Sequence, residues 1–238
     1  MTRLREFFIY TSMRLIARSL AAGKVQTIAS GTENLPSHGP ALIVARHYHH
    51  LFDGLTLFAA VERRFHIVVT MDWVQSRSAK LFMQSINRMA RWPMLLRRDA
   101  LNACGHAQTN FFTSNDVTGY QRRALREAIE LLVEGRILVV FPEGYPNIDP
   151  TYTPKTDPDQ FLPFKPGFLN ILGAAETRLG TKIPIIPAGL RYEPGKPWIG
   201  YLTFGKPLYR DKARHRDALI ERLAREVQRL SDVKVNND

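Results

Sequence analysis

The chain has 238 residues, of which 45% are hydrophobic and 23% are charged, so it suits one folded domain with a substantial core, and general disorder is excluded. Its 33 lysines and arginines outnumber 22 aspartates and glutamates, and the net charge of +11 attracts phosphate-bearing partners, nucleic acid and anionic lipid alike. Cys104 is the only cysteine, which excludes an intrachain disulfide and a cysteine metal cage and favours a reducing, cytoplasmic compartment.

The first 30 residues predict an amphipathic N-terminal helical segment. Its apolar residues share one broad helical face fringed by arginines; they are Leu4, Phe7, Phe8, Leu15 and Ile16. A helix of this kind either lies on anionic lipid or packs on the core of its own domain, and the pattern allows both. The basic residues interrupt the apolar core that a signal peptide needs, and no apolar run reaches the ~18 residues of a membrane-spanning helix.

From residue 31 to residue 210, short apolar runs alternate with helical patterns. Strands are predicted over 41–45, 66–70, 137–141, 183–190 and 198–204, and helices over 54–63, 79–90, 122–134 and 165–179. This alternation predicts an α/β fold, a single domain with a mixed central sheet flanked by helices. Residues 211–238 predict a C-terminal helix, over 216–230, and a tail. The prolines, aspartates and threonines of 145–163 predict an irregular surface loop within the domain.

The densest group of reactive side chains follows the first predicted strand, in RHYHHLFD. It contains His47, His49, His50 and Asp53, at the strand-to-helix position where open α/β sheets place their chemistry. Packing alone explains three imidazoles poorly, because buried polar groups need partners. A histidine oriented by a carboxylate is a general base near neutral pH.

Two other classes of function remain open from these residues. The three histidines and Asp53 could ligate zinc or another divalent ion in a metal-dependent hydrolase, although the remaining histidines form no ligand pairing. Alternatively, a non-enzymatic binder could hold nucleic acid or acidic lipid through its positive surface. Neither class explains the order of the motifs that follow the histidines.

That order resembles the glycerolipid acyltransferase family, which includes the lysophosphatidic acid and glycerol phosphate acyltransferases. The family's first block, an asparagine and a histidine followed by four residues and an aspartate, is similar to RHYHHLFD, and GTENLP and ALIVA precede it here. Its third block begins FPEG, as at 141–144, and is followed by a segment like FKPG at 164–167; its fourth is similar to IPIIPA at 183–188. The resemblance covers roughly residues 31–205, with 31–210 as the acyltransferase domain.

The resemblance implies an O-acyltransferase of phospholipid biosynthesis. His47 would be the general base and Asp53 the group that orients it, while Glu143 and Gly144 would lie in the substrate-binding loop. A thioester of coenzyme A or acyl carrier protein would be the donor, with no other cofactor and no metal, and a lysophospholipid or glycerol phosphate-like alcohol the acceptor. The expected location is the cytoplasmic face of a membrane, held peripherally by the N-terminal helix and surface arginines. Anionic lipid, and not nucleic acid, is then the expected macromolecular partner.

The chain departs from the family at two places. Five residues instead of four separate His47 from Asp53, and Arg46 replaces the asparagine, so His49, one helical turn before Asp53, is the alternate base. His47 is favoured because it directly follows the strand.

After FPEG the family continues with threonine, arginine and serine, and its arginine is associated with the phosphate of the acceptor, whereas this chain has a tyrosine, a proline and an asparagine. The replacement charge could come from Arg97, Arg98 or Lys165; the first two lie in WPMLLRRD, which is similar to the family's second block.

Overall fold

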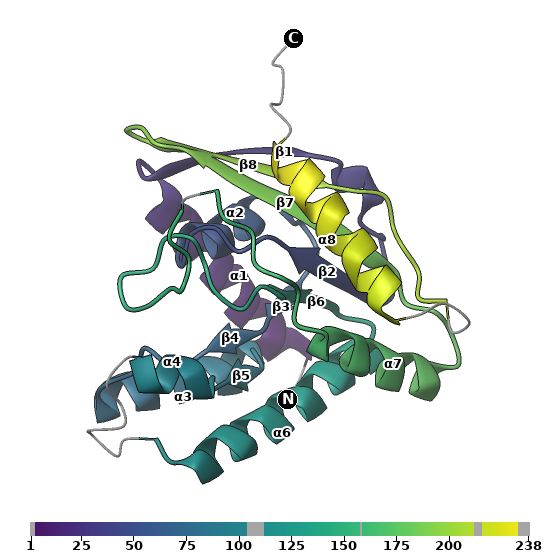
Figure 1. Cartoon of the computed structure of the whole chain (residues 1–238), viewed down its shortest axis with the longest axis horizontal. Coiled ribbons are helices and arrows are strands. Elements are labelled where there is room, and N and C mark those ends of the chain that lie inside the picture. The colour runs from purple at the N-terminus through teal and green to yellow at the C-terminus, as the bar shows by residue number, and fades with distance from the viewer. Residues whose placement is uncertain (1–2, 104–111, 158, 212–215, 233–238) are drawn as a thin grey trace.

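The computed structural model describes residues 3–103, 112–157, 159–211 and 216–232, with the side chains of these residues from residue 8 onward except at 103 and 114. The helices are α1 (Arg3–Ala21), α2 (Phe52–Ala60), α3 (Arg77–Ala90), α4 (Arg98–Ala103), α6 (Ser114–Val133), α7 (Gly167–Leu179) and α8 (Arg216–Asp232), with one 3-10 turn, η1 (Thr32–Asn34). The strands are β1 (Val25–Ser30), β2 (Ala41–Ala45), β3 (Phe65–Ile67), β4 (Val69–Thr70), β5 (Met94–Leu95), β6 (Ile137–Val140), β7 (Ile185–Glu193) and β8 (Trp198–Phe204). Figure 1 shows their arrangement.

Six strands form one mixed sheet in the order β1-β8-β7-β2-β6-β3. The pairs β3–β6, β6–β2 and β2–β7 are parallel, β7 and β8 are antiparallel, and β1 is parallel to β8. β4 and β5 form a separate parallel pair. The prediction of a single α/β domain with a mixed sheet flanked by helices is confirmed.

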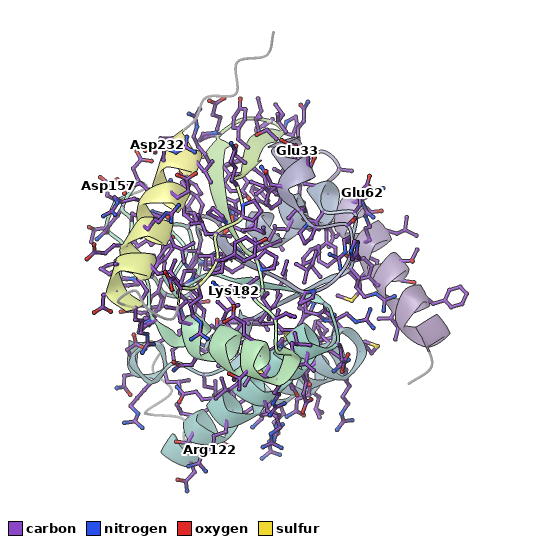
Figure 2. All side chains as sticks on the ribbon, turned by 90° about the vertical axis from the view of Figure 1, so that its right-hand side faces the viewer. Glu33, Glu62, Arg122, Asp157, Lys182 and Asp232 are labelled. Atoms are coloured by element: carbon purple, nitrogen blue, oxygen red, sulfur yellow. The ribbon has the colours of Figure 1, made fainter. Side chains whose placement is uncertain are left out.

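Helices cover both faces of this sheet, which explains why β2 is apolar throughout. Ala41, Ile43 and Ala45 belong to the core on the side of α1 and α2, whereas Leu42 and Val44 belong to the core formed with α6, α7 and α8. Because side chains alternate along a strand, a strand buried on both faces needs apolar residues at every position. In Figure 1, α8 lies across β7 while α6 and α7 lie beside β6. The side chains of Glu33, Arg122 and Asp232 lie at the periphery (Figure 2).

Residues 25–30 form an edge strand, although the sequence predicted a helical segment over residues 1–30. Helix α1 ends at Ala21, and Gly23 follows with a positive φ of 74°, a conformation that ends a helix cheaply only with glycine. The chain then enters the sheet as β1, which pairs with β8. The sheet therefore begins at Val25, before the predicted domain boundary at residue 31.

Helix α1 packs through a different face from the one that its large apolar residues define. Ala17 and Ala21 are buried and Tyr10 and Met13 pack beside them, whereas Phe8, Leu15 and Ile16 are 60%, 60% and 59% exposed. The side chains of Leu4 and Phe7 lie outside the described residues. Among the described helices, none is apolar over a length sufficient to span a bilayer.

Two helices were predicted too short or not at all. Helix α6 begins at Ser114 and not at residue 122, because Thr113 and Asp116 form a capping box whose side chains satisfy the first backbone N–H groups. Helix α4 lies in a stretch with no predicted element. The described part of 145–163 contains no helix or strand, as its composition predicted.

Candidate active site

The sheet places the histidine loop next to the FPEG loop. β2 and β6 are parallel neighbours in which Val44 pairs with Val140, so His47 and Glu143 follow this pair at the same edge of the sheet. The backbone N–H of His47 donates to Glu143 Oε1 at 3.0 Å, and the imidazole of His47 stacks on the ring of Phe141 at 4.4 Å. Two motifs almost a hundred residues apart thus meet at one position.

Asp53 is buried and organises the histidine loop. His47 Nδ1 lies 2.7 Å from Asp53 Oδ2, and the backbone N–H groups of Tyr48 and His49 donate to the same carboxylate at 2.8 and 3.1 Å. Since a carboxylate only accepts, Nδ1 carries the hydrogen, and Nε2 is left as the proton acceptor. The extra residue between His47 and Asp53 is therefore accommodated in a tight loop around the carboxylate.

His49, the alternate base, has another position. Its Nδ1 accepts from the N–H groups of Leu51 and Phe52 at 3.2 and 3.3 Å, so it caps the first turn of α2, and its ring stacks on Phe52 at 4.0 Å. Burial, with the adjacent His50, lowers the pKa of His49 to about 4. His49 is a neutral capping side chain whose Nδ1 lone pair is already used.

The histidines do not converge as metal ligands. His47 is bonded to Asp53, His49 caps α2, and His50 is exposed with Nδ1 3.3 Å from the carbonyl oxygen of Ile148. Across the part of the chain that the structure describes, no group of three or more histidine, cysteine, aspartate or glutamate side chains is arranged around a possible ion. The geometry therefore favours acid–base chemistry over the metal-site interpretation.

Glu143 is buried, and its carboxylate oxygens accept hydrogen bonds from three other residues of the chain. Its Oε1 holds the His47 N–H, and its Oε2 accepts from Lys155 Nζ at 2.7 Å and from the N–H of Leu162 at 3.0 Å. Glu143 therefore braces the histidine loop, and its contact with substrate stays a prediction. Lys155 was missed in the sequence because it lies in the irregular loop, outside every motif.

Arg97 and Lys165 both lie at the FPEG loop. Arg97 Nε is 2.5 Å from the buried Asp72, Nη1 donates to the Gly144 carbonyl, and the guanidinium lies over the Tyr145 ring at 4.0 Å. Lys165 is exposed, with Nζ 5.0 Å from the centre of the same ring. Two of the three candidate cations thus lie beside Gly144, while Arg98 is exposed at the first position of α4; which of them contacts an acceptor phosphate stays a prediction.

Tyr145, which replaces a threonine of the family motif, has a carboxylate partner. Its hydroxyl donates to Asp99 Oδ2 at 2.5 Å, and burial together with this hydrogen bond raises its pKa. Asp99 also lies 4.0 Å from Lys165 Nζ. Each of the two cations here, Arg97 and Lys165, therefore has an aspartate of the chain nearby.

Comparisons with known proteins give three findings. A family model described as Acyltransferase matches residues 26–191, which include both loops. The crystal structure of the 1-acyl-sn-glycerophosphate (LPA) acyltransferase PlsC from Thermotoga maritima is similar in fold, with a TM-score of 0.58 and 18% sequence identity, over 94% of this chain and 78% of that chain. A search of curated proteins gave no significant match.

Proposed function

Because this chain belongs to the acyltransferase family, we propose that it moves a fatty acyl group from a thioester to a hydroxyl of a lysophospholipid or glycerol phosphate-like acceptor, with His47 as the general base. The observation that carries the assignment of the base is the 2.7 Å hydrogen bond between His47 Nδ1 and the buried Asp53. The imidazole is 18% exposed, so an acceptor can reach its second nitrogen.

Transfer is direct in this scheme. His47 Nε2 takes the proton of the acceptor hydroxyl as its oxygen attacks the thioester carbonyl, and Asp53 stabilises the imidazolium that forms. Backbone N–H groups or a basic side chain stabilise the oxyanion of the tetrahedral intermediate. The carbon–sulfur bond then breaks, the imidazolium returns its proton to the thiolate, and an ester and a free thiol leave.

The donor is a thioester of coenzyme A or acyl carrier protein, and the scheme needs no metal and no further cofactor. For a phosphate on the acceptor, Lys165 is the better contact because it is exposed beside Gly144, whereas Arg97 already binds Asp72. Arg98 is exposed and can add charge at longer range. An acceptor phosphate would have to compete with Asp72 for the partly buried guanidinium of Arg97, whereas it can contact the exposed ammonium group of Lys165 with a smaller desolvation cost.

The experiment is to incubate the purified protein with a radiolabelled acyl thioester and a panel of lysophospholipids, glycerol phosphate and simple alcohols. We expect a labelled ester with one class of acceptor, and its loss in His47→Ala. Labelled free fatty acid without any ester, abolished by chelators, would instead identify a metal-dependent hydrolase. Binding to nucleic acid or lipid without any turnover would identify a non-enzymatic binder.

We also propose peripheral attachment to the cytoplasmic face of a membrane through α1, whose N-terminal part projects from the body (Figure 2). Phe8, Leu15, Ile16 and Leu20 are exposed apolar side chains on this helix, and the chain is strongly cationic. Vesicles containing anionic lipid should co-sediment the protein at low salt. A Phe8→Ser/Leu15→Ser variant should co-sediment several-fold less, and equal binding by the variant would remove α1 as the anchor.

A further inference from the structure

A buried ion pair holds both backbone polar groups of His47. The His47 N–H donates to Glu143 Oε1 at 3.0 Å, and the His47 carbonyl oxygen accepts from Lys155 Nζ at 3.1 Å. Glu143 and Lys155 are joined to each other at 2.7 Å, and both side chains have no exposed surface. The peptide groups on either side of the candidate base are thereby fixed by two side chains that also fix each other.

Lys155 has no hydrogen left for a substrate. Its ammonium group donates to Glu143 Oε2, to the His47 carbonyl and to Asn147 Oδ1 at 2.9 Å, which uses all three of its N–H bonds. It is therefore not a direct donor to the oxyanion of the reaction. Whatever Lys155 does for the chemistry, it does through His47 and Glu143.

The loop that carries Lys155 is attached to the histidine loop at a second place. The N–H of Ile148 donates to the carbonyl of Tyr48 at 2.8 Å, and the N–H of His50 donates to the carbonyl of Ile148 at 3.0 Å. Asn147, which accepts from Lys155, also donates to the carbonyls of Asp157 and Gln160, so the loop is closed on itself around the ammonium group. The position of the Lys155 side chain is therefore fixed by its own hydrogen bonds and by those of the loop that carries it.

We propose that Lys155 is a positioning residue for the acyl transfer, holding the backbone of His47 so that its imidazole points from Asp53 to the acceptor hydroxyl. This inference rests on His47 being the base in the proposed function. A buried ammonium group is stable only when its hydrogen bonds are satisfied; here one of the three goes to the His47 carbonyl, and a second holds Glu143, which accepts from the His47 N–H. A displacement of the base by about 1 Å is enough to lower a rate by about 100-fold.

The test compares Lys155→Met with Lys182→Met, a matched control at an exposed lysine that lies away from Asp157 of the loop in Figure 2. Lys155→Met should lower kcat by about 10- to 100-fold with KM for the thioester changed less than about 3-fold, while Lys182→Met is unchanged. The His47 Hε1 resonance, assigned by its loss in His47→Gln, should move in Lys155→Met and stay in place in Lys182→Met.

A second variant separates positioning from simple charge neutralisation. The double variant Glu143→Gln/Lys155→Met leaves no unpaired buried carboxylate, so it avoids the loss of stability expected of Lys155→Met alone. The His47 carbonyl still lacks its Lys155 donor in this variant. We expect kcat of this double variant to be about 10-fold lower than that of Glu143→Gln alone. Recovery to the Glu143→Gln value, or a His47 resonance that is the same in Lys155→Met and wild type, would overturn the proposal. The resonance decides this even if the wild-type protein transfers no acyl group, which would refute the proposed function separately.

Discussion

Neighbouring histidines at positions 47 and 49 should give opposite phenotypes when each is replaced by alanine. His47→Ala removes the proposed base, and loss of a general base lowers kcat by about 100- to 10 000-fold. Its side chain makes one hydrogen bond to a buried carboxylate and one ring stack, so the free energy of unfolding should fall by about 2–3 kcal/mol, which leaves a stable domain folded. The variant should therefore be folded and inactive.

His49→Ala should be active and less stable. It removes the cap of α2, worth about 1 kcal/mol, and a buried ring stacked on Phe52, worth a further ~1–2 kcal/mol. The free energy of unfolding should fall by about 2–3 kcal/mol, with kcat within about 3-fold of wild type. His49→Asn is the matched control: its amide oxygen can accept from the same N–H groups, so it should recover about 1 kcal/mol.

The measurements are thiol release at saturating acceptor for kcat, and urea unfolding at 25 °C followed by far-UV circular dichroism for stability. Activity that survives His47→Ala and disappears in His49→Ala would transfer the role of base to position 49. Activity in both single variants would remove the mechanism altogether.

Three further predictions concern other groups. Burial lowers the pKa of His66 to about 4, so between pH 6.5 and 4 only the unfolded chain takes up the proton, and the free energy of unfolding falls by up to about 3 kcal/mol as the pH is lowered through this range. His66→Gln should reduce this loss, which urea titrations at several pH values measure. Gly189→Ala should destabilise by at least about 2 kcal/mol in thermal unfolding, because its Cβ would lie 2.3 Å from the backbone of α8, whereas Gly119→Ala, in open space on α6, should stabilise slightly. Arg97→Gln leaves the buried Asp72 without its arginine and should lower the free energy of unfolding by about 3 kcal/mol in urea, a loss that adding Asp72→Asn should largely reverse. A pH dependence of stability that is the same in His66→Gln and wild type would contradict the first argument. Equal stability of Gly189→Ala and Gly119→Ala would contradict the second, and equal stability of Arg97→Gln and Arg97→Gln/Asp72→Asn would contradict the third.

The architecture was predictable because its signals are local. The apolar run at 41–45 and the helical spacing of 165–179 fall in one stretch of chain each, and both predicted elements are present as β2 and α7. The meeting of His47 with Glu143 was predictable at the same level, since both follow strands that end at one edge of a sheet. Strand β1 was missed because VQTIAS is short and half exposed at the edge.

The partners of the site residues were much less predictable. Lys155 and Asp72 are ordinary charged residues in sequence, and their roles depend on contacts with His47 and Arg97 that lie 108 and 25 residues away along the chain. No periodicity or turn signal encodes such pairs, since they arise only when separate segments fold together: the irregular loop with the histidine loop for Lys155, and the segments that follow β4 and β5 for Asp72. A charged side chain is stable in the interior only when it is paired, so a buried lysine or aspartate in the structure identifies such a pair, whereas a sequence motif does not.

The spacing between His47 and Asp53 shows how a motif can lengthen without losing its geometry. Asp53 accepts from one side chain and from two backbone N–H groups, those of Tyr48 and His49. Backbone donors are present whatever the residue, so an added residue supplies another N–H and the loop closes on the carboxylate again. The proposed mechanism needs a carboxylate inside the loop, with the histidine at the end of β2. In this chain five residues lie between His47 and Asp53, and their side chains still meet at 2.7 Å because the backbone N–H groups of Tyr48 and His49 turn inward to the carboxylate.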